Sequence, residues 1–142
     1  MTIHGCVIAG AARAVLILGA AGAGKSSLAL DLMARGARLV ADDRVVLQAR
    51  DGALIASAPI SLAGLIEVRG IGIARVAAQS SAAVSLVVDL DRAAAARLPD
   101  PLTWQHSGIT LRLIAGREVP RLCTMLELWL RGEMDFTDDA GA

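Results

Sequence analysis

A glycine-rich segment that ends in a lysine and a serine is the clearest chemical feature of the sequence. Gly19, Gly24, Lys25 and Ser26 fit the phosphate-binding pattern G-x-x-x-x-G-K-[ST]. In this pattern the backbone N–H groups of the loop surround an anion, and the positive end of the following helix points at it. The lysine reaches the β- and γ-phosphates of a nucleotide, and the serine hydroxyl is an oxygen ligand for Mg²⁺. The segment therefore predicts a nucleotide site.

The residues around this loop favour the same interpretation. An apolar strand is expected at Ala14–Leu18 before the loop, and a helix at Ser26–Arg35 after it. The alternative is a glycine-rich turn in which Lys25 is solvated and Ser26 only caps the helix. Because strand, loop and helix occur in the order that the motif needs, we favour phosphate binding. The predicted nucleotide-binding residues are Gly19, Ala20, Ala21, Gly22, Ala23, Gly24, Lys25, Ser26 and Ser27.

Two adjacent aspartates follow the next apolar strand, which is expected at residues 38–41. Asp42 and Asp43 would lie at the sheet edge where ligands of open α/β sheets collect. In an extended strand neighbouring side chains point to opposite sides, so one carboxylate is expected to face the phosphates and the other the backbone or a basic side chain. The first could hold Mg²⁺ through water or accept a proton from a hydroxyl. The alternative is a polar turn with an ion pair to Arg38 or Arg44.

Composition limits the other functional classes. The 142 residues suit one domain, 55% are hydrophobic, and 14 basic residues balance 14 acidic ones. This zero net charge and the scarcity of aromatic residues argue against nucleic-acid binding. The apolar runs are too short for a membrane span, and the first residues do not resemble a signal peptide. Cys6 and Cys123 are expected to be free thiols of a cytoplasmic protein.

The remaining pattern predicts an α/β fold with a mixed β-sheet and few helices, in one domain over residues 1–134. A helix is expected from Pro120, a helical turn at Ala93–Arg97, and a flexible tail over residues 135–142. The other expected strands are Ile3–Ile8, Arg44–Ala49, Ala53–Ser57, Leu65–Val76, Val84–Leu90 and Ile109–Ile114.

Several motifs in order resemble the catalytic domain of the HPr kinase/phosphorylase family. After the loop the chain reads "RGARLVADDRV", then "AP", then "LIEVRGIGI", and His4-Gly5 precedes the loop. The resemblance is specific from Ile3 to about Val76. It implies a single P-loop kinase domain, HPr kinase/PEP carboxykinase-like, in a short stand-alone form that lacks the family's N-terminal domain.

The resemblance also implies an activity and roles for individual residues. It implies an ATP-dependent, Mg²⁺-dependent kinase that phosphorylates a serine of a small phosphocarrier protein, HPr or its nitrogen-related homologue, in the phosphotransferase system. Reversal by inorganic phosphate would make it a phosphorylase as well. Lys25 would bind phosphates, Asp43 would be the base, and His4 would assist near the phosphates. Mg²⁺ would be held by Ser26, Glu67 and Asp42.

A catalytic arginine and a homo-oligomer complete what the resemblance implies. The family has an arginine well beyond its glutamate, for which Arg97 is the nearest candidate and Arg92 a competitor. An arginine that stabilises charge on a transferring phosphoryl group is expected on mechanistic grounds. Two other functions remain open from the residues alone, namely a small-molecule P-loop kinase and a non-catalytic nucleotide-binding regulator.

Overall fold

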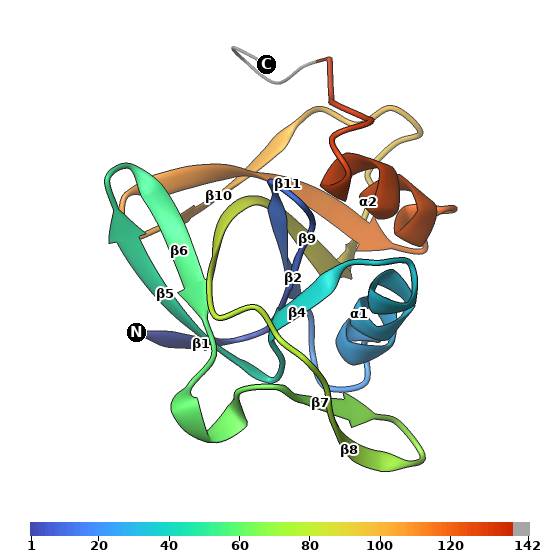
Figure 1. The fold of residues 1–142 in the computed structure, drawn as a ribbon. Coiled ribbons are helices and arrows are strands. Elements are labelled where there is room, and N and C mark those ends of the chain that lie inside the picture. The colour runs from blue at the N-terminus through green and yellow to red at the C-terminus, as the bar shows by residue number, and fades with distance from the viewer. Residues whose placement is uncertain (138–142) are drawn as a thin grey trace.

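A curled, mixed β-sheet forms the centre of the molecule, seen in a computed structural model that describes residues 1–137 (Figure 1). Its strands are β1 (Thr2–His4), β2 (Cys6–Ala9), β3 (Ala14–Leu18), β4 (Arg38–Ala41), β5 (Arg44–Arg50), β6 (Ala53–Ser57), β9 (Ala82–Ala93), β10 (Leu102–His106) and β11 (Ile109–Arg117). A separate hairpin contains β7 (Leu65–Val68) and β8 (Gly72–Arg75), preceded by the short 3-10 helix η1 (Ile60–Leu62). The two α-helices of this part of the chain are α1 (Lys25–Ala34) and α2 (Leu122–Leu130).

Strand β9 organises the sheet because it pairs with three others. It runs parallel to β3 and to β11, while its first residues pair antiparallel with β6. The strand order across the sheet is β1-β5-β6-β9-β3-β2-β4. Strand β11 also pairs with β9, and β10 pairs with β11. Leu18, the last residue of β3, pairs with Asp89 of β9, and β9 continues beyond this pair to Ala93. The loop after β3 therefore lies at the carboxyl edge of the parallel strands.

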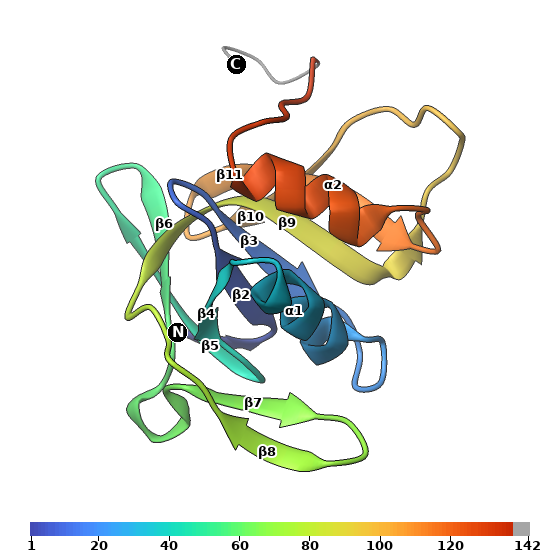
Figure 2. The same cartoon turned by 45° about the vertical axis from the view of Figure 1, so that its right-hand side comes forward.

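Alternating side chains of the strands fill two apolar cores. On one face of the sheet, Ile8, Val15 and Leu86 pack with residues of α1 and α2, and both helices lie over this face (Figure 2). On the other face, Leu16, Val45 and Val87 pack with residues of β6 and β11, where the sheet curls on itself. The two helices thus cover β3 on one face of the sheet only. None of the helices within residues 1–137 is long and apolar enough to cross a membrane.

Most expected elements are found, with four differences. The single strand expected at Ile3–Ile8 is two strands, because β1 pairs with β5 while β2 pairs with β3 and β4. The stretch expected as one strand at 65–76 is a hairpin, because Gly70 and Gly72 adopt positive φ angles of 82° and 142°. The helical turn expected at Ala93–Arg97 is wrong, since β9 continues to Ala93 and residues 94–97 are not helical. Strand β10 was not anticipated. The α/β class and the mixed sheet are confirmed.

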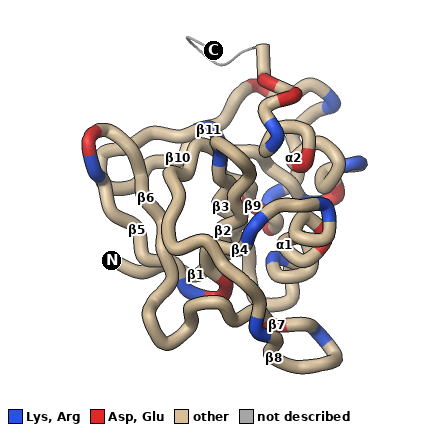
Figure 3. The backbone as a smooth tube through the Cα atoms, in the orientation of Figure 1, with Lys and Arg blue, Asp and Glu red and all other residues tan. Residues whose placement is uncertain are grey.

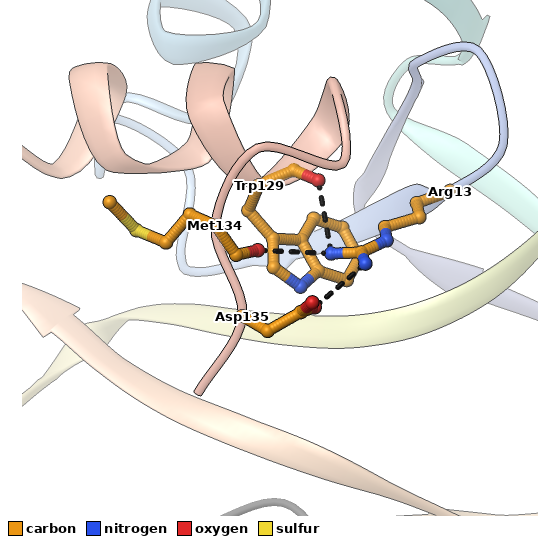
Figure 4. A network of polar contacts seen from close by, with 4 residues as sticks. All are labelled: Arg13, Trp129, Met134 and Asp135. Atoms are coloured by element: carbon orange, nitrogen blue, oxygen red, sulfur yellow. Dashed lines mark hydrogen bonds and ion pairs between the residues drawn. The ribbon is translucent and has the colours of Figure 1, made fainter. Parts of the chain in front are cut away.

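Arg13 joins the β2–β3 turn to the end of α2 (Figure 4). Its Nη1 donates hydrogen bonds to the carbonyl oxygens of Trp129 (3.2 Å) and Met134 (3.1 Å), and its Nη2 lies 2.7 Å from the Asp135 carboxylate. The guanidinium also lies over the Trp129 ring, 5.1 Å from its centroid. Asp135 therefore contacts the domain although a flexible tail was expected at 135–142, and residues 138–142 of that tail lie outside the described residues.

Charged residues of both signs are interspersed at turns, strand ends and helix surfaces (Figure 3). Together with the formal net charge of zero, this distribution gives little long-range attraction for a polyanion. The absence of nucleic-acid binding stays a prediction.

Candidate active site

The phosphate loop leaves β3 and enters α1 directly. Three glycines of the loop have positive φ angles, which other residues rarely adopt. The angles are 155° at Gly19, 86° at Gly22 and 101° at Gly24. The helix begins at Lys25, so its free N–H groups point toward the loop. Lys25 Nζ donates to the carbonyl oxygens of Gly19 (2.6 Å) and Ala20 (3.1 Å). The ammonium group is thereby held across the loop that it is expected to serve.

The two aspartates form the turn between β4 and β5, which corrects one expectation. We expected one carboxylate to face the phosphates and the other to turn away, as in an extended strand. Instead β4 ends at Ala41, and Asp43 has a φ angle of 70°, so the strand alternation does not apply. Both Asp42 and Asp43 line the same cavity. Among residues 1–137 neither carboxylate forms an ion pair, so the expected alternative of a pair with an arginine is not found.

Asp42 is buried, with 5% of its surface exposed, and it fixes two other residues of the site. The Ser26 hydroxyl lies 2.9 and 3.1 Å from its two carboxylate oxygens, and the Glu67 backbone N–H donates to it at 3.0 Å. Burial, with a further contribution from Asp42, raises the pKa of the Cys6 thiol well above its usual range. Cys6 therefore stays a neutral thiol beneath the aspartate. The carboxylate links the loop, the β4–β5 turn and the β7–β8 hairpin.

These elements surround one cavity of about 730 Å³. Its lining residues are His4, Gly19, Ala20, Ala21, Gly22, Gly24, Lys25, Ser26, Ser27, Asp42, Asp43, Glu67 and Arg69. The exposed carboxylate of Asp43 and the Lys25 side chain thus border the same space, and His4 enters it from β1. The structure brings together nearly all of the residues singled out in the sequence.

Two predicted residues are not brought to this cavity. Ala23 belongs to the loop but does not line the cavity. Its backbone N–H donates to the Ala20 carbonyl oxygen (3.0 Å). Arg97 is exposed in the segment between β9 and β10 and is also not in the lining. Its catalytic role stays a prediction.

Two residues near the loop were not chosen as site residues. Arg69 lines the cavity, and its guanidinium lies 3.5 Å from where a side chain on Gly22 would begin. Asp91 of β9 accepts a hydrogen bond from the Ala20 N–H at 2.7 Å. Arg69 could have been found from its place two residues after Glu67. Asp91 is 71 positions from Ala20, and only the pairing of β9 with β3 brings the two together.

The donor set suits a magnesium ion that a nucleotide brings with it. Mg²⁺ is usually bound by one or two carboxylates and by substrate phosphates, not by an all-protein cage. The described residues contain no group of three or more His, Cys, Asp or Glu arranged to hold a metal. The carboxylate of Asp42 is buried, forms no ion pair within residues 1–137 and lies beside the Ser26 hydroxyl, so these two side chains offer the oxygen atoms expected at such a site.

Comparison with known proteins places this arrangement in a family. The family model of the HPr Serine kinase C-terminal domain matches residues 1–123. The chain belongs to this family. The HPr kinase/phosphorylase of an Exiguobacterium species is 40% identical over 128 residues, which cover 84% of this chain. That of Lactobacillus johnsonii is 51% identical over 73 residues, which cover 51% of this chain. The matches span 40% and 23% of these relatives' own lengths.

A solved structure supports the same fold. The HPr(Ser) kinase/phosphatase from Coxiella burnetii superposes with a TM-score of 0.78 at 29% sequence identity. The match covers 93% of this HPr kinase-family chain and 95% of that chain. The expected HPr kinase-like fold with a mixed sheet is thereby confirmed.

Proposed function

We propose that this chain is an ATP-dependent protein-serine kinase that acts on a small HPr-like phosphocarrier of the phosphotransferase system. The observation that carries the proposal is the convergence of Lys25 of the phosphate loop and the exposed carboxylate of Asp43 on one cavity. A phosphoryl donor bound by the loop and a hydroxyl placed against Asp43 would meet there. Family membership supports the choice of a serine hydroxyl on a protein.

In the forward reaction the protein mainly positions groups and stabilises charge. The loop N–H groups and Lys25 hold the phosphates, and Asp43 accepts the proton of the serine hydroxyl. Asp42, Ser26 and Glu67 would hold Mg²⁺, which neutralises charge on the phosphates when bound. His4 lines the same cavity as Asp43 and would assist it there, and Arg69, which also lines the cavity, would supply a positive charge for the transferring group.

The same groups can operate in reverse. A protonated Asp43 can return its proton to the serine oxygen while inorganic phosphate takes up the phosphoryl group, which makes pyrophosphate. We therefore include phosphorylase activity in the proposal. The relatives' printed name, HPr kinase/phosphorylase, supports it. We further propose a cytoplasmic location and a homo-oligomeric assembly, on the family resemblance.

The test is a phosphotransfer assay with the purified chain, Mg·ATP and an HPr-like protein, with phosphoserine detected by mass spectrometry. Asp43→Asn should lower the rate by about 10²–10⁴-fold, the usual contribution of a positioned base, while Mg·ATP still binds. Asp51→Asn is the matched control, because Asp51 is also an aspartate with positive φ (51°) but lies at the far end of β5. This control should transfer phosphate at the wild-type rate.

Other outcomes would identify a different function. Transfer to a sugar or other small molecule but not to the protein would show a small-molecule kinase. Full activity of Asp43→Asn would refute the assigned base. Nucleotide binding without transfer to any acceptor would leave a non-catalytic regulator.

A further inference from the structure

Strand β9 places an aspartate against the start of the phosphate loop. β9 is the parallel neighbour of β3, and Leu18 at the end of β3 pairs with Asp89. Two residues later, Asp91 reaches across, and its Oδ2 accepts the N–H of Ala20 at 2.7 Å. An N–H bonded to a carboxylate makes a stronger hydrogen bond than one bonded to a neutral acceptor.

The peptide groups on either side of Ala20 are held by further hydrogen bonds. The Ala20 carbonyl oxygen accepts from the Ala23 N–H (3.0 Å) and from Lys25 Nζ (3.1 Å), while its N–H donates to Asp91. The preceding position is closely surrounded, since a side chain on Gly19 would begin 3.0 Å from Ala23 Cβ and 3.3 Å from Leu90 Cβ. The carboxylate is thus the one protein partner from outside the loop and helix that is seen to hold this turn in the described chain.

The aspartate itself is held in place by its neighbour. Asp89 Oδ1 accepts the backbone N–H of Asp91 at 2.9 Å, which fixes the local path of the chain after the parallel pairing with β3. Because Asp91 is exposed, water competes for its hydrogen bond with Ala20, so this bond adds little to the free energy of unfolding. Its main effect is to restrict the conformation of the loop.

We propose that Asp91 is a positioning residue for the phosphate loop. By accepting the Ala20 N–H it keeps the first half of the loop in the conformation that receives the nucleotide phosphates, so less conformational freedom is lost on binding. This role rests on the proposed function of the same cavity. Asp91 is not assigned any contact with the nucleotide.

The role predicts a difference between two substitutions. Asp91→Ala removes the acceptor, and the dissociation constant and KM for Mg·ATP should rise about five-fold, as for the loss of one ordinary hydrogen bond. The value of kcat at saturating ATP should change little. Asp91→Asn keeps a carbonyl oxygen that can accept the N–H and removes the charge, so Mg·ATP affinity should stay within about two-fold of the wild type.

Isothermal titration calorimetry with Mg·ATP measures the affinities, and thermal unfolding verifies that each variant is folded. Asp51→Asn removes one negative charge far from the loop and corrects for net charge. Equal affinity of wild type and Asp91→Ala would overturn the role of Asp91. Equal weakening by Ala and Asn, or tighter binding by both, would do the same, because neither result depends on an acceptor oxygen.

The two proposals fail in different ways. If wild type binds Mg·ATP and Lys25→Ala does not, the nucleotide site stands whatever Asp91 does. If wild type binds no nucleotide, the proposed function fails, and the role of Asp91 fails with it.

Discussion

Arg13 allows a quantitative prediction, because its contacts are few and lie away from the cavity. Replacing it with alanine removes two hydrogen bonds to backbone carbonyl oxygens, an ion pair with Asp135 and a stacked contact with Trp129. Each hydrogen bond is worth about 1 kcal/mol. The ion pair adds at most about 0.5 kcal/mol because the Asp135 side chain is 60% exposed. The stacked contact adds about 0.5 kcal/mol.

Side-chain ordering opposes these gains, because fixing an arginine costs up to about 2 kcal/mol. Only 25% of the Arg13 side chain is exposed, so apolar contacts of its methylene groups offset part of this entropic cost. We expect Arg13→Ala to lower the free energy of unfolding by about 2 kcal/mol. Nucleotide affinity should not change, since Arg13 does not line the cavity.

Urea unfolding followed by circular dichroism measures the change. Arg13→Lys keeps the charge but loses the two-pronged geometry, so it should recover less than half of the loss. Asp135→Asn should cost at most about 0.5 kcal/mol. Arg50→Ala, an exposed arginine at the end of β5, is the control and should stay within about 0.5 kcal/mol of wild type. If Arg13→Ala behaves like Arg50→Ala, the backbone hydrogen bonds do not stabilise the fold.

Two further predictions concern the core. Gly10→Ala would place Cβ 2.3 Å from the Leu130 carbonyl oxygen, so α2 must shift. Urea unfolding should show that the free energy of unfolding falls by about 2–3 kcal/mol. An unchanged free energy of unfolding would contradict this packing. The pKa of Cys6 is raised in the folded chain above the usual thiol value of 9.0. The contribution of the neutral thiol to the free energy of unfolding is therefore complete below pH 9.0 and is lost as the pH rises above this value, where the thiol of the unfolded chain loses its proton. Without Mg²⁺, the stability of wild type should fall above pH 9.0 more steeply than that of Cys6→Ala, by up to about 1.4 kcal/mol per pH unit; parallel curves would refute this.

Local chemistry explains why the phosphate loop and its helix could be predicted from sequence. Glycines at positive φ, a lysine and the start of a helix are all encoded within a few residues. The aspartate turn was placed correctly, but its conformation was not, because positive φ at Asp43 is set by the β4–β5 connection. The Asp91 contact depends on the parallel pairing of strands that are distant in sequence, which no local pattern reveals.

Tertiary pairing also explains the errors in the second half of the chain. The alanines near Ala93 have high helix propensity, but pairing of Ala93 with Arg117 of β11 keeps this position in β9. Strand β10 was missed because Pro99 and Pro101 indicate a loop. Yet Leu102 and Trp104 alternate with polar residues, and both pack on the core beneath the sheet.

The β7–β8 hairpin has a further consequence for the stability of the site. Within the described residues it pairs only with itself, and Ile66 is the buried side chain that anchors it to the core. Isolated two-stranded hairpins are marginally stable, so this wall of the cavity should open at lower cost than the main sheet. Glu67 and Arg69 would leave with it. Mild denaturant should therefore abolish phosphotransfer while the circular dichroism of the sheet persists. A bound nucleotide should slow amide hydrogen exchange in the hairpin before it does so elsewhere.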